Sequence, residues 1–240
     1  MLCENGLIVT FENYMSVSEV ICSPVDAEEV AVAVVDAPRT RKRPKPGERR
    51  EQILQALAAM LEKPGSERIT TAALAASLSV SEAALYRHFA SKAQMYEGLI
   101  EFIEQSVFTL IQQIVPREVE EGETTAEDNA RRAARLVAVV LQFAERNPGM
   151  VRVMVGDAIL FEHERLQARM NQFFERIEST LRQCLRPAAN ALGSNKPTVE
   201  AQVAASVLTS FMLGRMQRFA RSGFRRLPTE HMDASLAMLL

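Results

Sequence analysis

The stretch at residues 70–92 constrains the fold more than any other part of the chain. It predicts two short helices joined by a tight turn, followed at once by the start of a third helix. Leu74 and Leu78 share one face of the first short helix, and Leu85 and Phe89 lie one helical turn apart on the second. Because a helix this short is unstable alone in water, the stretch must fold as a packed unit with one face left over.

The predicted helix starts carry capping residues. Ser81 occupies the N-cap position of the second short helix, where its hydroxyl can accept a hydrogen bond from a backbone amide. Glu82 follows it and complements the positive end of the helix dipole. Ser91 repeats the arrangement at the start of the third helix, which supports the predicted boundaries.

The face left over carries small or hydrogen-bonding side chains, and such a surface suits a helix laid in the major groove of DNA. Basic residues near the helix starts are predicted to contact backbone phosphates. The predicted DNA-contacting residues are Arg49, Arg50, Thr70, Thr71, Ser81, Glu82, Ala83, Tyr86, Arg87, His88 and Lys92. Spacing alone leaves a second interpretation open, since any small three-helix domain can present polar residues outside a bent helix pair.

The run LAASLSVSEAALYRHFASK closely resembles the DNA-binding domain of TetR-type regulators, with Leu-Ala, a small-residue turn, Val-Ser, Leu-Tyr-x-His-Phe and Ser-Lys in order. The resemblance implies an N-terminal helix-turn-helix domain followed by a C-terminal helical bundle. The turn residue that is usually Gly in this family is Ser79 here. If that position needs a left-handed backbone, Ser costs about 1 kcal/mol relative to Gly.

Length and composition are those of an ordinary globular protein. The 240 residues are 48% hydrophobic and 24% charged, and no apolar run approaches the ~20 residues that a membrane-spanning helix needs. The N-terminus lacks the segments of a secretory signal, and Cys3, Cys22 and Cys184 have no metal or disulfide spacing, so a cytoplasmic location is predicted. The net charge of −2 argues neither for nor against a nucleic-acid partner.

Sequence signatures of enzymes are missing. The chain has no Gly-rich phosphate loop and no GxSxG motif. His163 lies between two glutamates without metalloprotease spacing and is interpreted as a surface residue, while His88 is assigned to the DNA-binding unit and His231 is isolated. The Met and Phe stripes are interpreted as core. We therefore expect no enzyme activity, no catalytic residue, no cofactor and no metal site.

Charge divides the N-terminal part of the chain. Residues 1–38 carry seven acidic side chains and no Lys or Arg, whereas residues 39–50 place seven basic residues against one acidic residue. Residues 1–46 are predicted to be a disordered extension. Its basic part is either a solvated linker or an arm that follows DNA phosphates, and its position before the DNA-binding unit favours the arm. A DNA-binding domain is predicted at residues 47–91 and a dimerisation and partner-binding domain at residues 92–240.

Apolar periodicity predicts about nine helices and no strand, so the predicted fold class is all-α. Besides the short pair, the predicted helices cover residues 48–63, 92–115, 130–147, 150–155, 158–186, 198–219 and 232–240. The last segments offer more apolar surface than one small bundle can cover, which predicts a two-fold homodimer through residues 198–219 and 232–240. Such a dimer presents two reading helices to the half-sites of a palindrome.

The resemblance extends beyond the DNA-binding unit. The runs ITTAALAASLSVSEAALYRHFASK, LIEFIEQS, FAERNPGM and LFEHERLQARMNQFFERIESTLRQ together resemble nucleoid occlusion factors, a branch of the TetR-type family. This resemblance implies a nucleoid-associated inhibitor of cell division that binds palindromic double-stranded DNA as a dimer. It also implies that the dimer engages the C-terminal tail of the tubulin-like division protein FtsZ, in a groove between the helices predicted at residues 92–115 and 130–147.

The resemblance carries over candidate residues for the FtsZ groove. Phe102 in IEFIE and Arg146 and Asn147 in ERNPG match family positions on it. Phe offers an apolar contact, and Arg can bind a carboxylate bidentately. The alternatives are that Phe102 belongs to the core and that Asn147 is a helix C-cap. The remaining groove positions are occupied by Leu110, Val139 and Gln142.

Two other functions stay open on the sequence. A ligand-responsive repressor of TetR type needs an apolar pocket in the bundle and release from DNA when the inducer binds. A helical adaptor without DNA binding would hold its protein partner tightly and show no salt-dependent affinity for duplex.

Overall fold

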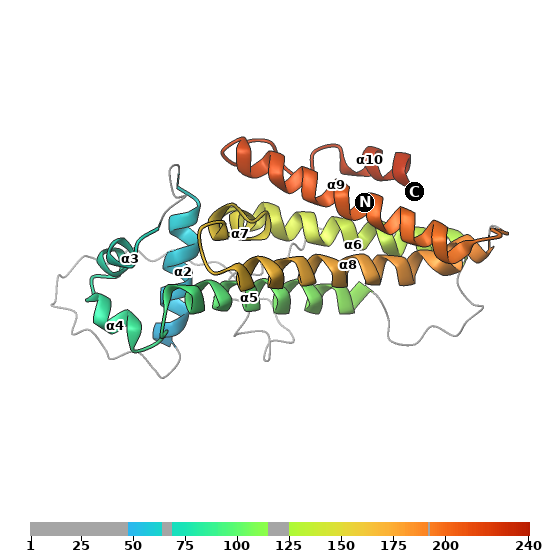
Figure 1. The fold of residues 1–240 in the computed structure, drawn as a ribbon. Coiled ribbons are helices and arrows are strands. Elements are labelled where there is room, and N and C mark those ends of the chain that lie inside the picture. Colours follow the sequence, from blue (N-terminus) through green and yellow to red (C-terminus); the bar gives the residue numbers. More distant parts are fainter. Residues whose placement is uncertain (1–47, 64–68, 115–124, 192) are drawn as a thin grey trace, which may run out of the picture.

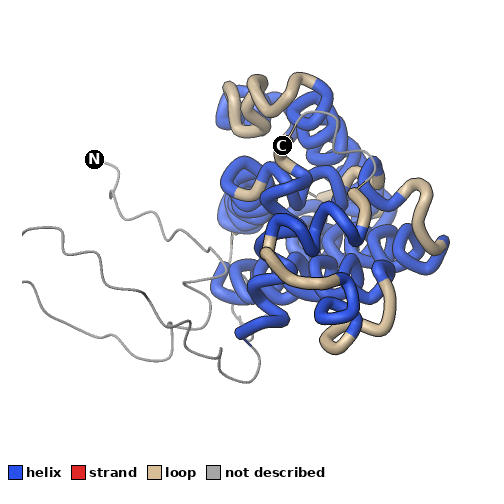
Figure 2. Tube along the Cα trace, turned by 90° about the vertical axis from the view of Figure 1, so that its left-hand side faces the viewer, coloured by secondary structure: helices blue, strands red, loops and turns tan. Residues whose placement is uncertain are grey.

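The computed structural model describes residues 48–63, 69–114, 125–191 and 193–240. In this part of the chain there are nine α-helices, one short 3-10 helix and no strand, which confirms the all-α prediction (Figures 1 and 2). The extension predicted at residues 1–46 and most of the acidic loop at residues 116–128 lie outside the described residues.

Three helices form a head at one end of the molecule, namely α2 (Glu48–Leu61), α3 (Thr71–Ser77) and α4 (Glu82–Tyr86) (Figure 1). Its interior is apolar, with Leu57, Leu74, Leu85 and Phe89 each at most 1% exposed. The two short helices therefore pack as the unit that their sequence predicts. Removing these side chains from water stabilises helices that are too short to persist alone.

The long helix α5 (Lys92–Ile114) leaves the head and enters a bundle with α6 (Ala126–Arg146), α8 (Glu164–Ala191) and α9 (Pro197–Arg221) (Figure 1). The short helix α7 (Pro148–Met154) lies where the bundle meets α2, and α10 (Met232–Leu239) runs beside α9. Viewed from the head end, the head stands in front of the bundle (Figure 2). None of the described helices is long and apolar enough to cross a membrane.

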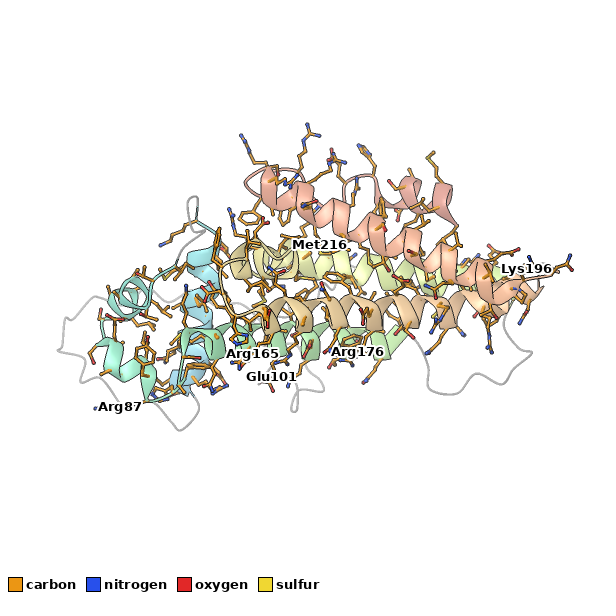
Figure 3. The ribbon with its side chains drawn as sticks, viewed as in Figure 1. Arg87, Glu101, Arg165, Arg176, Lys196 and Met216 are labelled. Carbon is orange, nitrogen blue, oxygen red and sulfur yellow. The ribbon has the colours of Figure 1, made fainter. Side chains whose placement is uncertain are left out.

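Charged side chains fix α8 on α5. Arg165 Nε lies 2.7 Å from a carboxylate oxygen of Glu97, and the Arg176 guanidinium lies 3.9 Å from the centre of the Phe108 ring. Both arginines follow the seam between the two helices (Figure 3). These contacts hold α8 parallel to α5, the helix that connects the head to the bundle.

The largest departure from the sequence prediction is the start of α8. The predicted helix at residues 158–186 is interrupted: Asp157–Ile159 form a 3-10 turn after Gly156, whose φ is 87°, and α8 begins only at Glu164. Leu160 and Phe161, which lie inside the predicted helix at residues 158–186, are 61% and 68% exposed. At its other end α8 continues through Pro187 to Ala191, where the sequence predicted a connector. Periodicity misjudged both ends because it cannot detect a local backbone break or a tolerated proline.

Candidate nucleic-acid interface

The turn between α3 and α4 is a helix C-cap of the Schellman type. The Val80 amide donates to the Ala75 carbonyl at 3.0 Å, and the Ser79 amide donates to the Ala76 carbonyl at 3.0 Å. Ser79 has a φ of 54°, in the left-handed region. The condition stated for Ser79, a left-handed backbone, is thereby met, and the cost of serine there stays a prediction. A serine carries the backbone conformation for which glycine is the usual residue.

Hydrogen bonds at the starts of α3 and α4 fix how the two helices meet. Thr70 caps α3 by accepting from the Ala73 amide at 3.1 Å, and Ser81 caps α4 by accepting from the Ala84 amide at 3.3 Å. The Thr71 hydroxyl donates to a carboxylate oxygen of Glu82 at 2.6 Å and so ties the two starts together. The side chains that make these bonds, all predicted to contact DNA, thus orient α4, the helix predicted to enter the major groove; they belong to Thr70, Thr71, Ser81 and Glu82.

The outward side of α4 is available to a duplex. Ala83, Tyr86, Arg87 and His88 are exposed, while Leu85 on the opposite side is fully buried. Arg87 lies at the outer edge of the head (Figure 3). The structure therefore brings the small, aromatic and cationic side chains of the prediction together on one helix face, the size and polarity of which suit a major groove.

Two of the predicted phosphate-binding cations have partners within the protein. The Arg50 guanidinium donates to the His88 carbonyl at 3.3 Å and stacks over the Phe89 ring at 4.2 Å, so it braces the end of α4. The Lys92 ammonium lies 2.5 Å from a carboxylate oxygen of Glu162. Their contacts with DNA stay predictions, and in the described structure these charges link parts of the protein. Arg49 is half-buried at the start of α2.

Three of the six candidate partner residues lie on one stripe of α6. Val139, Gln142 and Arg146 follow each other at helical spacing; Val139 is half-buried, and Gln142 and Arg146 are exposed. Leu110, near the end of α5, is half-buried. Phe102 is only 6% exposed and belongs to the core.

Asn147 ends α6 and begins α7. It is the C-cap of α6, and its side-chain amide donates to the Phe143 carbonyl at 2.8 Å. The structure thus supports the core and capping alternatives for Phe102 and Asn147. A surface stripe of α6 remains the part of the predicted groove that a partner could reach.

Comparison with known proteins identifies the family. Residues 53–99 match the model of the bacterial regulatory proteins of the tetR family, and residues 127–240 match an SlmA-like model described as a tetracyclin repressor-like C-terminal domain. The nucleoid occlusion factor SlmA of Idiomarina loihiensis is 50% identical over 186 residues, covering 78% of this chain and 90% of that protein. SlmA of Vibrio cholerae is 49% identical, covering 80% and 93%. The chain belongs to the SlmA family.

Solved structures show the same fold at low sequence identity. The TetR family regulator PfmR of Thermus thermophilus matches with a TM-score of 0.62 and 22% identity, over 79% of this chain and 97% of that one. The regulator KstR2 of Mycobacterium tuberculosis matches with a TM-score of 0.58 and 18% identity, over 80% and 93%. This SlmA-family chain therefore has a TetR-type fold with a helix-turn-helix DNA-binding domain.

Two residues at the junction of head and bundle escaped the sequence analysis of this SlmA-family chain. Glu162, the partner of Lys92, lies 70 residues away from it in the chain. Gly149 appears in the sequence only as part of the run ERNPG, yet it packs against α2 in the structure. Neither residue stands out in its local pattern, since the partner comes from a distant segment.

Candidate metal ligands and the thiol of Cys184 complete the description of the polar groups. Among the described residues, no group of three or more His, Cys, Asp or Glu side chains is placed to hold a metal ion. Cys184 is buried in α8, and burial raises the pKa of its thiol. A thiol held protonated in this way is a poor nucleophile, so we interpret Cys184 as a packing residue of the core.

Proposed function

We propose that this chain is a DNA-bound nucleoid occlusion factor that acts in the cytoplasm on the nucleoid. The observation that carries the proposal is the exposed face of α4, on a TetR-type head within an SlmA-family chain. A dimer on palindromic sites engages the C-terminal tail of FtsZ and prevents a septum from closing over the DNA.

Dimerisation is proposed through α9. Val199, Val203 and Val207 repeat every four residues on this helix and are 57%, 58% and 44% exposed. An apolar stripe of this kind is costly to leave in water and suits the self-complementary interface of a two-fold dimer. A second copy covering the stripe would hold two heads at a fixed separation, as paired half-sites require.

The partner surface is proposed on α6. The Arg146 guanidinium can bind a carboxylate. Val139, about two helical turns earlier on the same stripe, offers an apolar contact. An extended tail with acidic and apolar residues fits this combination. Gln142 between them can donate to a peptide carbonyl.

The experiment that tests the proposal is sedimentation of FtsZ polymers with the purified protein, with and without its cognate duplex. We expect the duplex to increase polymer loss, and an Arg146→Ala variant to lose the effect while keeping its DNA affinity. Equal polymer loss with and without duplex would count against a DNA-dependent division inhibitor.

A ligand-responsive repressor is the second candidate, and one cavity favours it. A cavity of about 520 Å³ lies between α7, α8 and α9. Apolar Met170 and Phe174 share its lining with polar Asn171, Glu175 and Gln217. The footprint of the protein on its own chromosome separates the candidates, because scattered sites that spare the terminus indicate division control and a single promoter site indicates a repressor.

A further inference from the structure

The head sits on the bundle through a backbone contact at Gly149. A Cβ atom built on Gly149 would lie 2.1 Å from the Ala58 carbonyl oxygen, 3.0 Å from the Ala58 carbonyl carbon and 3.1 Å from Glu62 Cγ. Ala58 belongs to α2 and Gly149 to the first turn of α7. The nearest neighbour is backbone, which cannot turn aside as a side chain can. Any other residue at position 149 must therefore push α2 and α7 apart.

A second contact lies at the first residue of α5, where the chain passes from the head into the bundle. Lys92 begins α5 where the head ends, and its ammonium pairs with Glu162 in the segment before α8, with side chains 28% and 18% exposed. Burial and the nearby Glu162 carboxylate also raise the pKa of Tyr96 well above its usual value. Partial burial reduces screening by solvent and salt, so this pair restrains the junction more than a surface pair would.

A displacement of α2 would be transmitted directly to α4, the helix predicted to enter the major groove. Arg50 on α2 donates to the His88 carbonyl at 3.3 Å and stacks on Phe89, immediately after α4. At the other end of this path, Asn147 is the residue shared by α6 and α7, next to the α6 stripe. Besides the direct connection through α5, the bundle thus contacts α4 through α7 and α2, and Gly149 lies at the contact between α7 and α2.

We propose that Gly149 and the Lys92–Glu162 pair are positioning residues that set which half-site spacing the dimer accepts. The inference rests on the proposed DNA-bound dimer. Moving a Cβ from 2.1 Å to the 3.4 Å of ordinary contact requires about 1.3 Å at α2. Two heads displaced in this way change their separation by up to ~2.6 Å, which approaches the rise of ~3.4 Å per base pair.

The test measures affinity for duplexes in which two half-sites, recovered with the wild-type protein from randomised DNA, are separated by spacers that change one base pair at a time. Gly149→Ala should move the optimum by one base pair or lower affinity about tenfold at the wild-type optimum, the loss of roughly one base contact. Its affinity for a single half-site should stay within about twofold of wild type. Glu162→Gln, which adds no heavy atom, should reduce the difference in affinity between the best spacing and the neighbouring spacings.

Gly98→Ala is the matched control. Its new Cβ would meet the two Leu54 methyl groups at 3.1 Å and the edge of the Phe89 ring at 3.5 Å, which are side-chain atoms and not backbone, and the end of the Leu54 side chain can move aside. The control should keep the wild-type optimum. Circular dichroism and sedimentation check that each variant is a folded dimer, and if Gly149→Ala does not fold, Glu162→Gln decides alone.

An unchanged spacing profile in the folded variants, even with a lower melting temperature, would overturn the inference and leave these contacts merely structural. If the wild type itself shows no preference for paired half-sites, the proposed function fails instead. The two failures are therefore distinguishable.

Discussion

Replacing Ser79 with Gly should stabilise the head. Ser79 has a φ of 54°, where a side chain costs about 1–2 kcal/mol that glycine avoids. Glycine also gives the unfolded chain more conformational freedom, which lowers the free energy of unfolding by about 0.4–1 kcal/mol. The net expectation is a gain of about 1 kcal/mol in the free energy of unfolding, or a rise in melting temperature of about 2–4 °C for a chain of this size.

Ser77→Gly provides a matched control two residues earlier. Ser77 ends α3 with ordinary helical geometry, and its hydroxyl donates to the Leu74 carbonyl at 2.7 Å. Glycine there should destabilise the head by roughly 0.5 kcal/mol from helix propensity alone. The same chemical change at the two positions is therefore expected to have opposite signs.

Hydrogen exchange of the α2 to α4 amides is the assay, since it reports the free energy of opening the head separately from the bundle. Melting curves at one fixed protein concentration provide the second measurement, because a dimer melts in a concentration-dependent way. DNA affinity should not change, as the turn keeps its geometry. A loss of stability in Ser79→Gly, or equal effects of both substitutions, would refute the reasoning.

Four further substitutions test other parts of the molecule. Tyr86→Ala should weaken binding to all duplexes alike, whereas Ala83→Gln should change the preference at one base position by roughly 1–3 kcal/mol; a uniform loss from both, measured by anisotropy, would contradict this division. Val203→Asp should convert the dimer to a monomer in sedimentation velocity, and an intact dimer would place the interface elsewhere. Thr125 donates to Asp128 from its hydroxyl at 2.7 Å and lowers the pKa of that carboxyl below its usual 3.8, so the stabilisation is present above this value and is lost as pH falls through the folded pKa. Thr125→Val should therefore melt earlier than wild type at pH 7. The difference should shrink in acid, where the variant lacks only the N-cap hydrogen bond that Thr125 accepts from the Asp128 amide at 3.1 Å; a difference that does not change with pH would exclude the bond to the carboxylate as a contributor.

Sequence reasoning performed best where the signal is local. The caps at Ser81 and Ser91 are present, with Ser91 accepting from the Gln94 amide at 3.2 Å. It performed worst where a regular pattern conceals a break, as at Leu160 and Phe161, which lie inside the predicted helix at residues 158–186. Phe102 shows a third case, since a resemblance to a groove position does not reveal that the ring lies in the core.

The sequence by itself determined where helices occur, the caps at Ser81 and Ser91 and the polar face of α4, because each depends on residues within about one helical turn of each other. Only the tertiary structure decided how the head sits on the bundle. The Gly149 contact with Ala58 and the pairing of Lys92 with Glu162 join segments far apart in the chain. A missing Cβ or a single carboxylate has no periodicity, so its meaning appears only when the folded backbone brings the partner to it.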